Sequence, residues 1–132
     1  MASATWQTQE IAAATLVTAP DGSAVSILCA GARGSMISFA LPPGAVSKAV
    51  AHRTVEEIWY VVAGAGRLWR LQGRAEEIVA LTPGLSLTVP VSARFQFRND
   101  GDAPLQIVAV TMPPWPGDGE AFVVEGPWTA TI

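Results

Sequence analysis

The stretch Gly44–Gly64 has the sequence GAVSKAVAHRTVEEIWYVVAG, and its spacing decides the fold. The first glycine is followed by five residues, then by Val50-x-His52, four residues, Glu57, six residues and the closing glycine. The residues between the glycines are mostly small, β-branched or aromatic, which is typical of strands. Glycine is favoured in tight turns because it accepts backbone angles that other residues avoid. The stretch therefore predicts strands that end at glycine turns.

A second stretch with regularly spaced glycine, proline and asparagine residues, Gly84–Asn99, has the sequence GLSLTVPVSARFQFRN. Gly84 is followed by five residues, then by Pro90-x-Ser92, two residues, Phe95, three residues and Asn99. Over the whole chain, 12 glycines and 10 prolines separate short segments, which predicts a sandwich or barrel of many short strands. No segment has a convincing helical period with caps. We expect strands at residues 11–18, 24–30, 35–41, 46–52, 57–62, 66–71, 76–81, 86–89, 94–98, 105–112 and 122–125.

Both stretches resemble the two sequence motifs of the cupin superfamily. The first family motif is Gly, five residues, His-x-His, three or four residues, Glu, six residues and Gly. The second is Gly, five residues, Pro-x-Gly, two residues, His, three residues and Asn. Residues 44–64 and 84–99 keep all of these spacings. The resemblance implies an all-β, double-stranded β-helix (jelly-roll) cupin barrel. We expect residues 1–132 to form one domain, with a proline-rich tail at 113–132 that wraps the barrel.

The resemblance also identifies where the family binds a divalent metal. The four ligand positions correspond to Val50, His52, Glu57 and Phe95 in this sequence. Valine and phenylalanine bind no metal, and His52 is the only histidine in the chain. A catalytic zinc site needs three protein ligands and a structural one needs four. We therefore expect no cofactor and assign no metal site; His52 and Glu57 are the ligands if a divalent metal binds at all.

The positions on the motif strands predict which side chains point into the barrel. Successive side chains of a strand alternate between its two faces. If His52 and Glu57 point inward, the predicted inner surface is apolar with few polar groups, as in small-molecule sites. The predicted pocket consists of Lys48, Val50, Trp59, Val61, Phe95 and Phe97, with His52 and Glu57 as its candidate catalytic residues.

Three functions are compatible with this pocket. The first is a barrel that binds a small organic molecule without the three-histidine metal site. The second is a metal-free isomerase, epimerase or cyclase that uses His52 and Glu57, because a carboxylate beside an imidazole raises its basicity and suits proton transfer. The third is an atypical, dioxygenase-like metal-binding cupin in which His52 and Glu57 are ligands. The sequence leaves all three open.

Composition limits the partners and the compartment. The net charge is −3, and the single lysine and seven arginines form no basic stripe, so we expect no nucleic-acid partner. No apolar run is long enough to span a membrane, and we expect no membrane contact. The single cysteine, Cys29, and the lack of a signal-peptide pattern predict a cytoplasmic protein. The family resemblance makes a homodimer the expected assembly.

Overall fold

The computed structural model describes residues 6–132 and is built almost entirely of strands. One 3-10 turn, η1 (Ile11–Ala13), precedes the first strand. The strands are β1 (Thr15–Thr18), β2 (Ala24–Ala30), β3 (Ser35–Leu41), β4 (Val50–His52), β5 (Glu56–Ala63), β6 (Gly66–Gln72), β7 (Ala75–Leu81), β8 (Ser86–Val89), β9 (Arg94–Asn99), β10 (Leu105–Met112) and β11 (Ala121–Val123). None of the helices among the described residues is long and apolar enough to cross a membrane. The predicted all-β jelly roll is confirmed.

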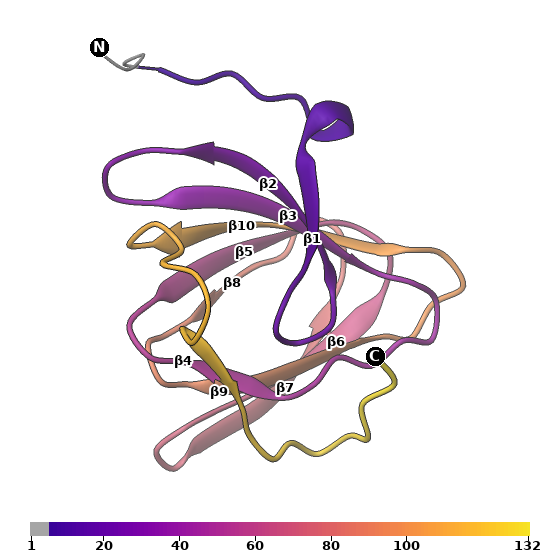
Figure 1. Cartoon of the computed structure of the whole chain (residues 1–132). Coiled ribbons are helices and arrows are strands. Elements are labelled where there is room, and N and C mark those ends of the chain that lie inside the picture. Colours follow the sequence, from indigo (N-terminus) through magenta and orange to yellow (C-terminus); the bar gives the residue numbers. More distant parts are fainter. Residues whose placement is uncertain (1–5) are drawn as a thin grey trace.

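The strands form two antiparallel sheets that face each other (Figure 1). The six-stranded sheet has the order β1-β2-β3-β10-β5-β8, and the five-stranded sheet has the order β11-β4-β9-β6-β7. Strands β5 and β10 alternate strictly between buried and outward residues, because one face of each packs on the core. The hairpin of β2 and β3 extends beyond the other strands of its sheet, and this overhang shapes one end of the barrel.

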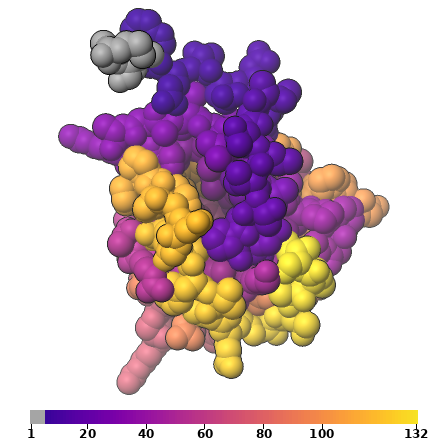
Figure 2. Space-filling model, in the orientation of Figure 1, coloured from indigo at the N-terminus to yellow at the C-terminus, as the bar shows by residue number. Residues whose placement is uncertain are grey.

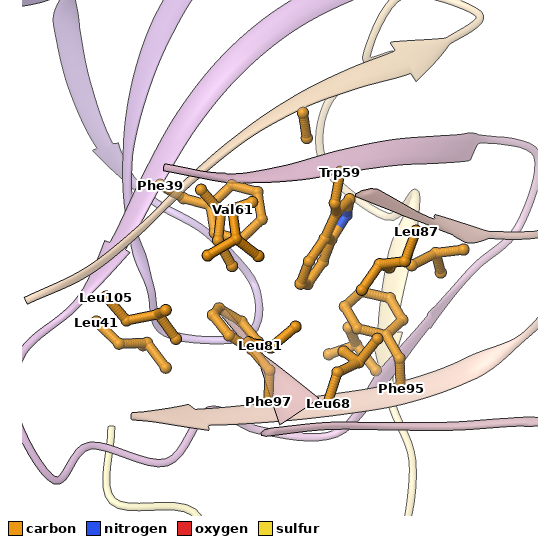
Figure 3. Close-up of a cluster of buried hydrophobic side chains, with 14 of the residues drawn as sticks. Phe39, Leu41, Trp59, Val61, Leu68, Leu81, Leu87, Phe95, Phe97 and Leu105 are labelled. Carbon is orange, nitrogen blue, oxygen red and sulfur yellow. The ribbon is translucent and has the colours of Figure 1, made fainter. Parts of the chain in front are cut away.

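Four aromatic side chains fill the space between the sheets, as Figure 3 shows. Trp59 packs edge-to-face on Phe39, Phe95 and Phe97, with ring centroids 4.7, 5.7 and 5.2 Å apart. Phe39 and Phe97 also meet edge-to-face, at 5.5 Å. Edge-to-face contact is favourable because the positive edge of one ring meets the negative face of the next. These four rings therefore fill much of the space between the two sheets.

Residues of the motifs stabilise the turns between the strands. Gly64 has φ +95°, and a Cβ there would lie 2.7 Å from backbone atoms of Pro104 and Leu105. Asn99 donates from its Nδ2 atom to the carbonyl oxygens of Leu41 and Ala103, at 3.0 and 2.8 Å. Buried backbone carbonyls need such donors. The side chain of Asn99 therefore fixes the turn that leads into β10.

Three of the predicted strands are shorter in the structure, and the last of them, predicted at 122–125, is β11 at Ala121–Val123. Residues 11–13 form η1, whose backbone bonds locally from the Ala14 N–H to the Ile11 oxygen at 3.2 Å, and β1 starts only at Thr15. The predicted strand 46–52 is reduced to β4 and one isolated bridge at Val46. The reason is that the Lys48 N–H donates to the Asp21 oxygen of the β1–β2 loop, at 2.8 Å, instead of pairing with a strand.

Candidate functional site

A cavity of about 660 Å³ opens at one end of the barrel, beside the overhanging β2–β3 hairpin. It is lined by residues of β1, β2, β3 and β5, by Phe95 of β9, by the β1–β2 loop and by the segment that follows β10. In Figure 2 the orange segment after β10 lies beside the indigo N-terminal segment on this side of the molecule. The residues on which the argument below depends are Asp21, Ser23, Phe39, Glu57, Trp59, Phe95, Trp115 and Asp118, all of which line the cavity.

Hydrogen bonds hold the two irregular walls in place. The Trp115 N–H donates to the Ser35 hydroxyl at 3.1 Å, and this hydroxyl is also hydrogen-bonded to the Thr111 hydroxyl. In the β1–β2 loop, the Oδ1 atom of Asp21 accepts from the Ser23 N–H at 2.9 Å and from its hydroxyl at 2.7 Å. Such side-chain bonds replace the strand pairing that loops lack. Both walls are therefore ordered parts of the cavity.

Glu57 reaches the cavity from β5, between the aromatic core and the opening. Its Oε1 atom accepts a hydrogen bond from Trp59 Nε1 at 2.7 Å; the two residues are two apart on the strand and share its inner face. The pKa of Glu57 is raised from 4.5 to about 7, mainly by burial and with a smaller contribution from the Asp21 charge, against the Trp59 hydrogen bond that lowers it. Burial also raises the pKa of Asp21. Near neutral pH, Glu57 therefore exists in both protonation states, as proton transfer requires.

His52 lies behind Glu57, packed edge-to-face between Phe95 and Trp115 at 5.2 and 5.1 Å between ring centroids. Its Nδ1 atom is 3.9 Å from the Oε2 atom of Glu57 and has no hydrogen-bond partner among the described residues. Burial lowers the pKa of His52 from 6.5 to about 4, although the Glu120 carboxylate opposes this shift. The expectation that Glu57 raises the basicity of His52 is therefore wrong: the imidazole is neutral at physiological pH because desolvation disfavours its cation.

The side chains at the family's metal positions do not fit a metal ion. Val50 and Phe95 are buried apolar residues, and Phe95 packs on His52 and Trp59. Within residues 6–132, no group of three His, Cys, Asp or Glu side chains is placed to hold a metal. Two donors, one of them a neutral imidazole 3.9 Å from the carboxylate, are fewer than a catalytic metal site requires. We therefore derive no chemistry through a metal.

The structure divides the predicted pocket residues into two groups. Glu57, Trp59 and Phe95 line the cavity. Val50, His52, Val61 and Phe97 are buried and do not line it. Their side chains point inward as predicted. The cavity, however, lies at one end of the barrel, and strand alternation does not indicate a position along the barrel.

The position predicted for Lys48 is corrected. Its side chain is exposed and does not line the cavity. The alternation argument fails because residues 46–49 are not a regular strand, and Lys48 lies on the β1–β2 loop through its backbone bond to Asp21. The Lys48 charge lowers the pKa of Asp21, against the larger effect of burial, so it acts on the site only from outside.

Sequence reasoning missed the cavity residues that lie outside the two motifs. Asp21 and Ser23 belong to a turn marked in the sequence only by Asp21-Gly22, and Phe39 is in a strand without motif residues. Trp115 belongs to the tail that was expected to wrap the barrel, and the structure places it on the cavity wall beside His52. The sequence carries only a weak signal for these residues, because each is brought to the cavity by contacts with distant parts of the chain.

Solved structures with the same architecture have low sequence identity to the chain. KdgF from a Halomonas species superimposes with a TM-score of 0.72 at 17% identity, over 85% of this chain and 97% of its own. Streptomyces Pac13, solved with uridine, gives 0.68 at 14%, over 88% of each chain, and is described as a nucleoside dehydratase. A predicted oxalate decarboxylase from Thermotoga maritima gives 0.67 at 17%, over 81% and 99%. These similarities show the fold.

The family follows from the sequence itself. The sequence profile of the family described as "Cupin domain" matches residues 37–111, from β3 to the end of β10. The matched region contains both spaced motifs and more than half of the chain. The chain belongs to the cupin domain family.

Proposed function

We propose that this cupin binds a small organic molecule in the cavity at the end of its barrel, without the usual metal of the family. The observation that supports this is the cavity itself, about 660 Å³ in volume and lined mainly by apolar side chains with a few polar groups. Small-molecule sites are typically clefts of roughly 300–1,000 Å³ with that composition. Neighbouring structures of the same fold include one solved with a nucleoside, uridine.

The test is a fragment screen read out on the tryptophan indole N–H signals by NMR. Trp59 and Trp115 line the cavity, whereas Trp69 and Trp128 lie outside it and serve as internal controls. We expect fragments that shift the two cavity signals and leave the two controls unchanged. A screen in which no fragment of any charge shifts Trp59 or Trp115 selectively would contradict the proposal.

A cavity-filling variant strengthens this test. Ile27→Trp adds a large side chain at an exposed position of the cavity wall. It should abolish fragment binding while the protein stays folded. Ile78→Trp is the matched control, because Ile78 is equally accessible but lies on β7 of the other sheet, outside this cavity. Equal binding by both variants would place the fragments elsewhere.

A second candidate is a metal-free acid–base enzyme that uses Glu57. It is supported by the buried carboxyl at the cavity wall, whose pKa of about 7 allows it to take up and release protons near neutral pH. In this proposal His52 is a neutral neighbour of Glu57 instead of the base, because its pKa is about 4.

Proton abstraction can be tested without knowing the substrate. Incubating the protein in D₂O with a panel of small ketones, aldehydes and reducing sugars should give deuterium at the carbon next to a carbonyl, measured by NMR. Glu57→Gln should lose this exchange, and Glu56→Gln, which alters an exposed neighbour, should keep it. If the wild-type protein exchanges no compound of the panel faster than buffer, the acid–base candidate is wrong.

A further inference from the structure

The polar side chains of the cavity include acidic groups and no basic ones among the described residues. Three of them are carboxyls, Asp21, Glu57 and Asp118, and the others are hydroxyls such as that of Ser23. Within residues 6–132, no lysine, arginine or histidine side chain lines the cavity. A carboxylate or phosphate ligand would have no cationic partner there and would meet like charges. The cavity therefore disfavours anions.

The two buried carboxyls each keep one oxygen free. Glu57 is 5% exposed and Asp21 is 8% exposed. Glu57 Oε1 is bonded to Trp59 and Asp21 Oδ1 to Ser23, but no described residue hydrogen-bonds to Glu57 Oε2 or Asp21 Oδ2. Neither oxygen is fully buried: among the described residues, His52 Nδ1 is the one completely buried side-chain nitrogen or oxygen without a hydrogen-bond partner, so both oxygens remain accessible. Both residues line the same cavity, and the Asp21 charge raises the pKa of Glu57, so the two carboxyl groups lie close enough to interact; Glu57 Oε2 is also 3.9 Å from His52 Nδ1.

Aromatic side chains form the remaining walls near these carboxyls. Phe39, Trp59, Phe95 and Trp115 line the cavity, and Trp59 carries the indole that holds Glu57 in place. Aromatic faces attract cations, most strongly where water is excluded, and they also pack against an apolar ligand body. Carboxylates combined with aromatic walls therefore suit a molecule with a positive group on an apolar frame.

We infer that the ligand of this cavity is a small organic amine, whose ammonium group binds the free oxygens of Glu57 and Asp21 while its apolar body packs on the aromatic walls. This inference rests on the proposed function, because it names the chemical class of the molecule bound there. The ammonium group supplies the donors that the two carboxyls lack, and its charge offsets their mutual repulsion.

Amine binding should strengthen as the pH rises from 6 to 8. Glu57 must be ionised to hold the ammonium group, and with a pKa of about 7 it is mostly protonated at the lower pH. The groups facing it are Asp21, His52 and the aromatic walls; Lys48 acts on Asp21 from the surface, and Asp118 is exposed at the rim. The change in ionised fraction alone predicts an affinity gain of about tenfold.

The experiment compares three molecules of matched shape: 2-phenylethylamine, 2-phenylethanol and 3-phenylpropanoate. Each is titrated into the protein at pH 7.5, with the Trp59 and Trp115 indole signals as the readout. We expect the amine to bind at least about tenfold more tightly than the alcohol, and the carboxylate most weakly. Glu57→Gln and, independently, Asp21→Asn should bring the ratio of amine to alcohol affinity close to one.

The outcomes separate this inference from the proposed function. If the alcohol or the carboxylate binds in the cavity as tightly as the amine, the ligand class is wrong and the binding function stands. The same holds if only neutral or anionic fragments of the screen bind there. If no fragment of any charge binds in the cavity, the proposed function fails and the inference fails with it.

Discussion

Replacing Glu57 with glutamine should change the pH dependence of folding stability in a defined direction. Burial raises the pKa of Glu57 from 4.5 in the unfolded chain to about 7 in the folded protein. Between these values the folded state keeps a proton that the unfolded state has released. This preferential proton binding to Glu57 stabilises the folded state; the stabilisation is complete below pH 4.5 and is lost as the pH rises through 7. The two pKa values correspond to a difference of about 3 kcal/mol in the free energy of unfolding.

His52 has the opposite dependence over nearly the same pH range. Burial lowers its pKa from 6.5 to about 4, so stability that is present above pH 6.5 is lost as the pH falls through 4. In the wild-type protein the two effects oppose each other between pH 4.5 and 6.5, and the stability curve should be nearly flat there. Glutamine cannot ionise. As the pH rises from 4.5 to 8, the free energy of unfolding of the Glu57→Gln protein should therefore increase by about 3 kcal/mol relative to that of the wild type.

Urea unfolding followed by tryptophan fluorescence across this pH range measures the effect. Glu56→Gln is the matched control, because it removes the adjacent carboxylate on the exposed face of the same strand. Its curve should run parallel to that of the wild type. If the curve of Glu57→Gln also runs parallel to wild type, within about 0.5 kcal/mol, then Glu57 does not carry the raised pKa and the electrostatic argument is refuted.

Three further predictions concern the scaffold around the site, each measured by urea unfolding. Gly66→Ala should cost at least about 2 kcal/mol, because its Cβ would lie 2.0 Å from a carbonyl oxygen of β9; Gly31→Ala, whose Cβ would meet only the Gly34 oxygen at 4.0 Å, should cost little. Gln96→Ala should cost about 2 kcal/mol and speed hydrogen exchange at Trp128, whose backbone N–H and C=O it bonds at 3.1 and 2.8 Å. Ser92→Gly should stabilise by about 1 kcal/mol, because Ser92 has φ +67°; an unchanged or lower stability would show that this backbone is not strained.

Much of the barrel was predictable because its strands are specified by local chemistry. The predicted limits of β2, β3, β8 and β10 agree with the structure at both ends. The prediction failed where pairing with a distant partner decides the conformation, as at Lys48, whose N–H bonds to the β1–β2 loop. A pattern read along one segment carries no information on which distant segment satisfies its backbone groups.

The sequence by itself determined the family, the barrel and the inward direction of Glu57 and His52, because motif spacing and strand alternation are local properties. Only the tertiary structure decided where the cavity lies and how the two groups titrate. Asp21 and Trp115, far apart in the chain, close the cavity around Glu57, and Phe95 seals His52 from water. Burial is the sum of contacts from many segments. Burial raises the pKa of Glu57 to about 7 and lowers that of His52 to about 4, and these values cannot be predicted from the spacing of residues along the chain.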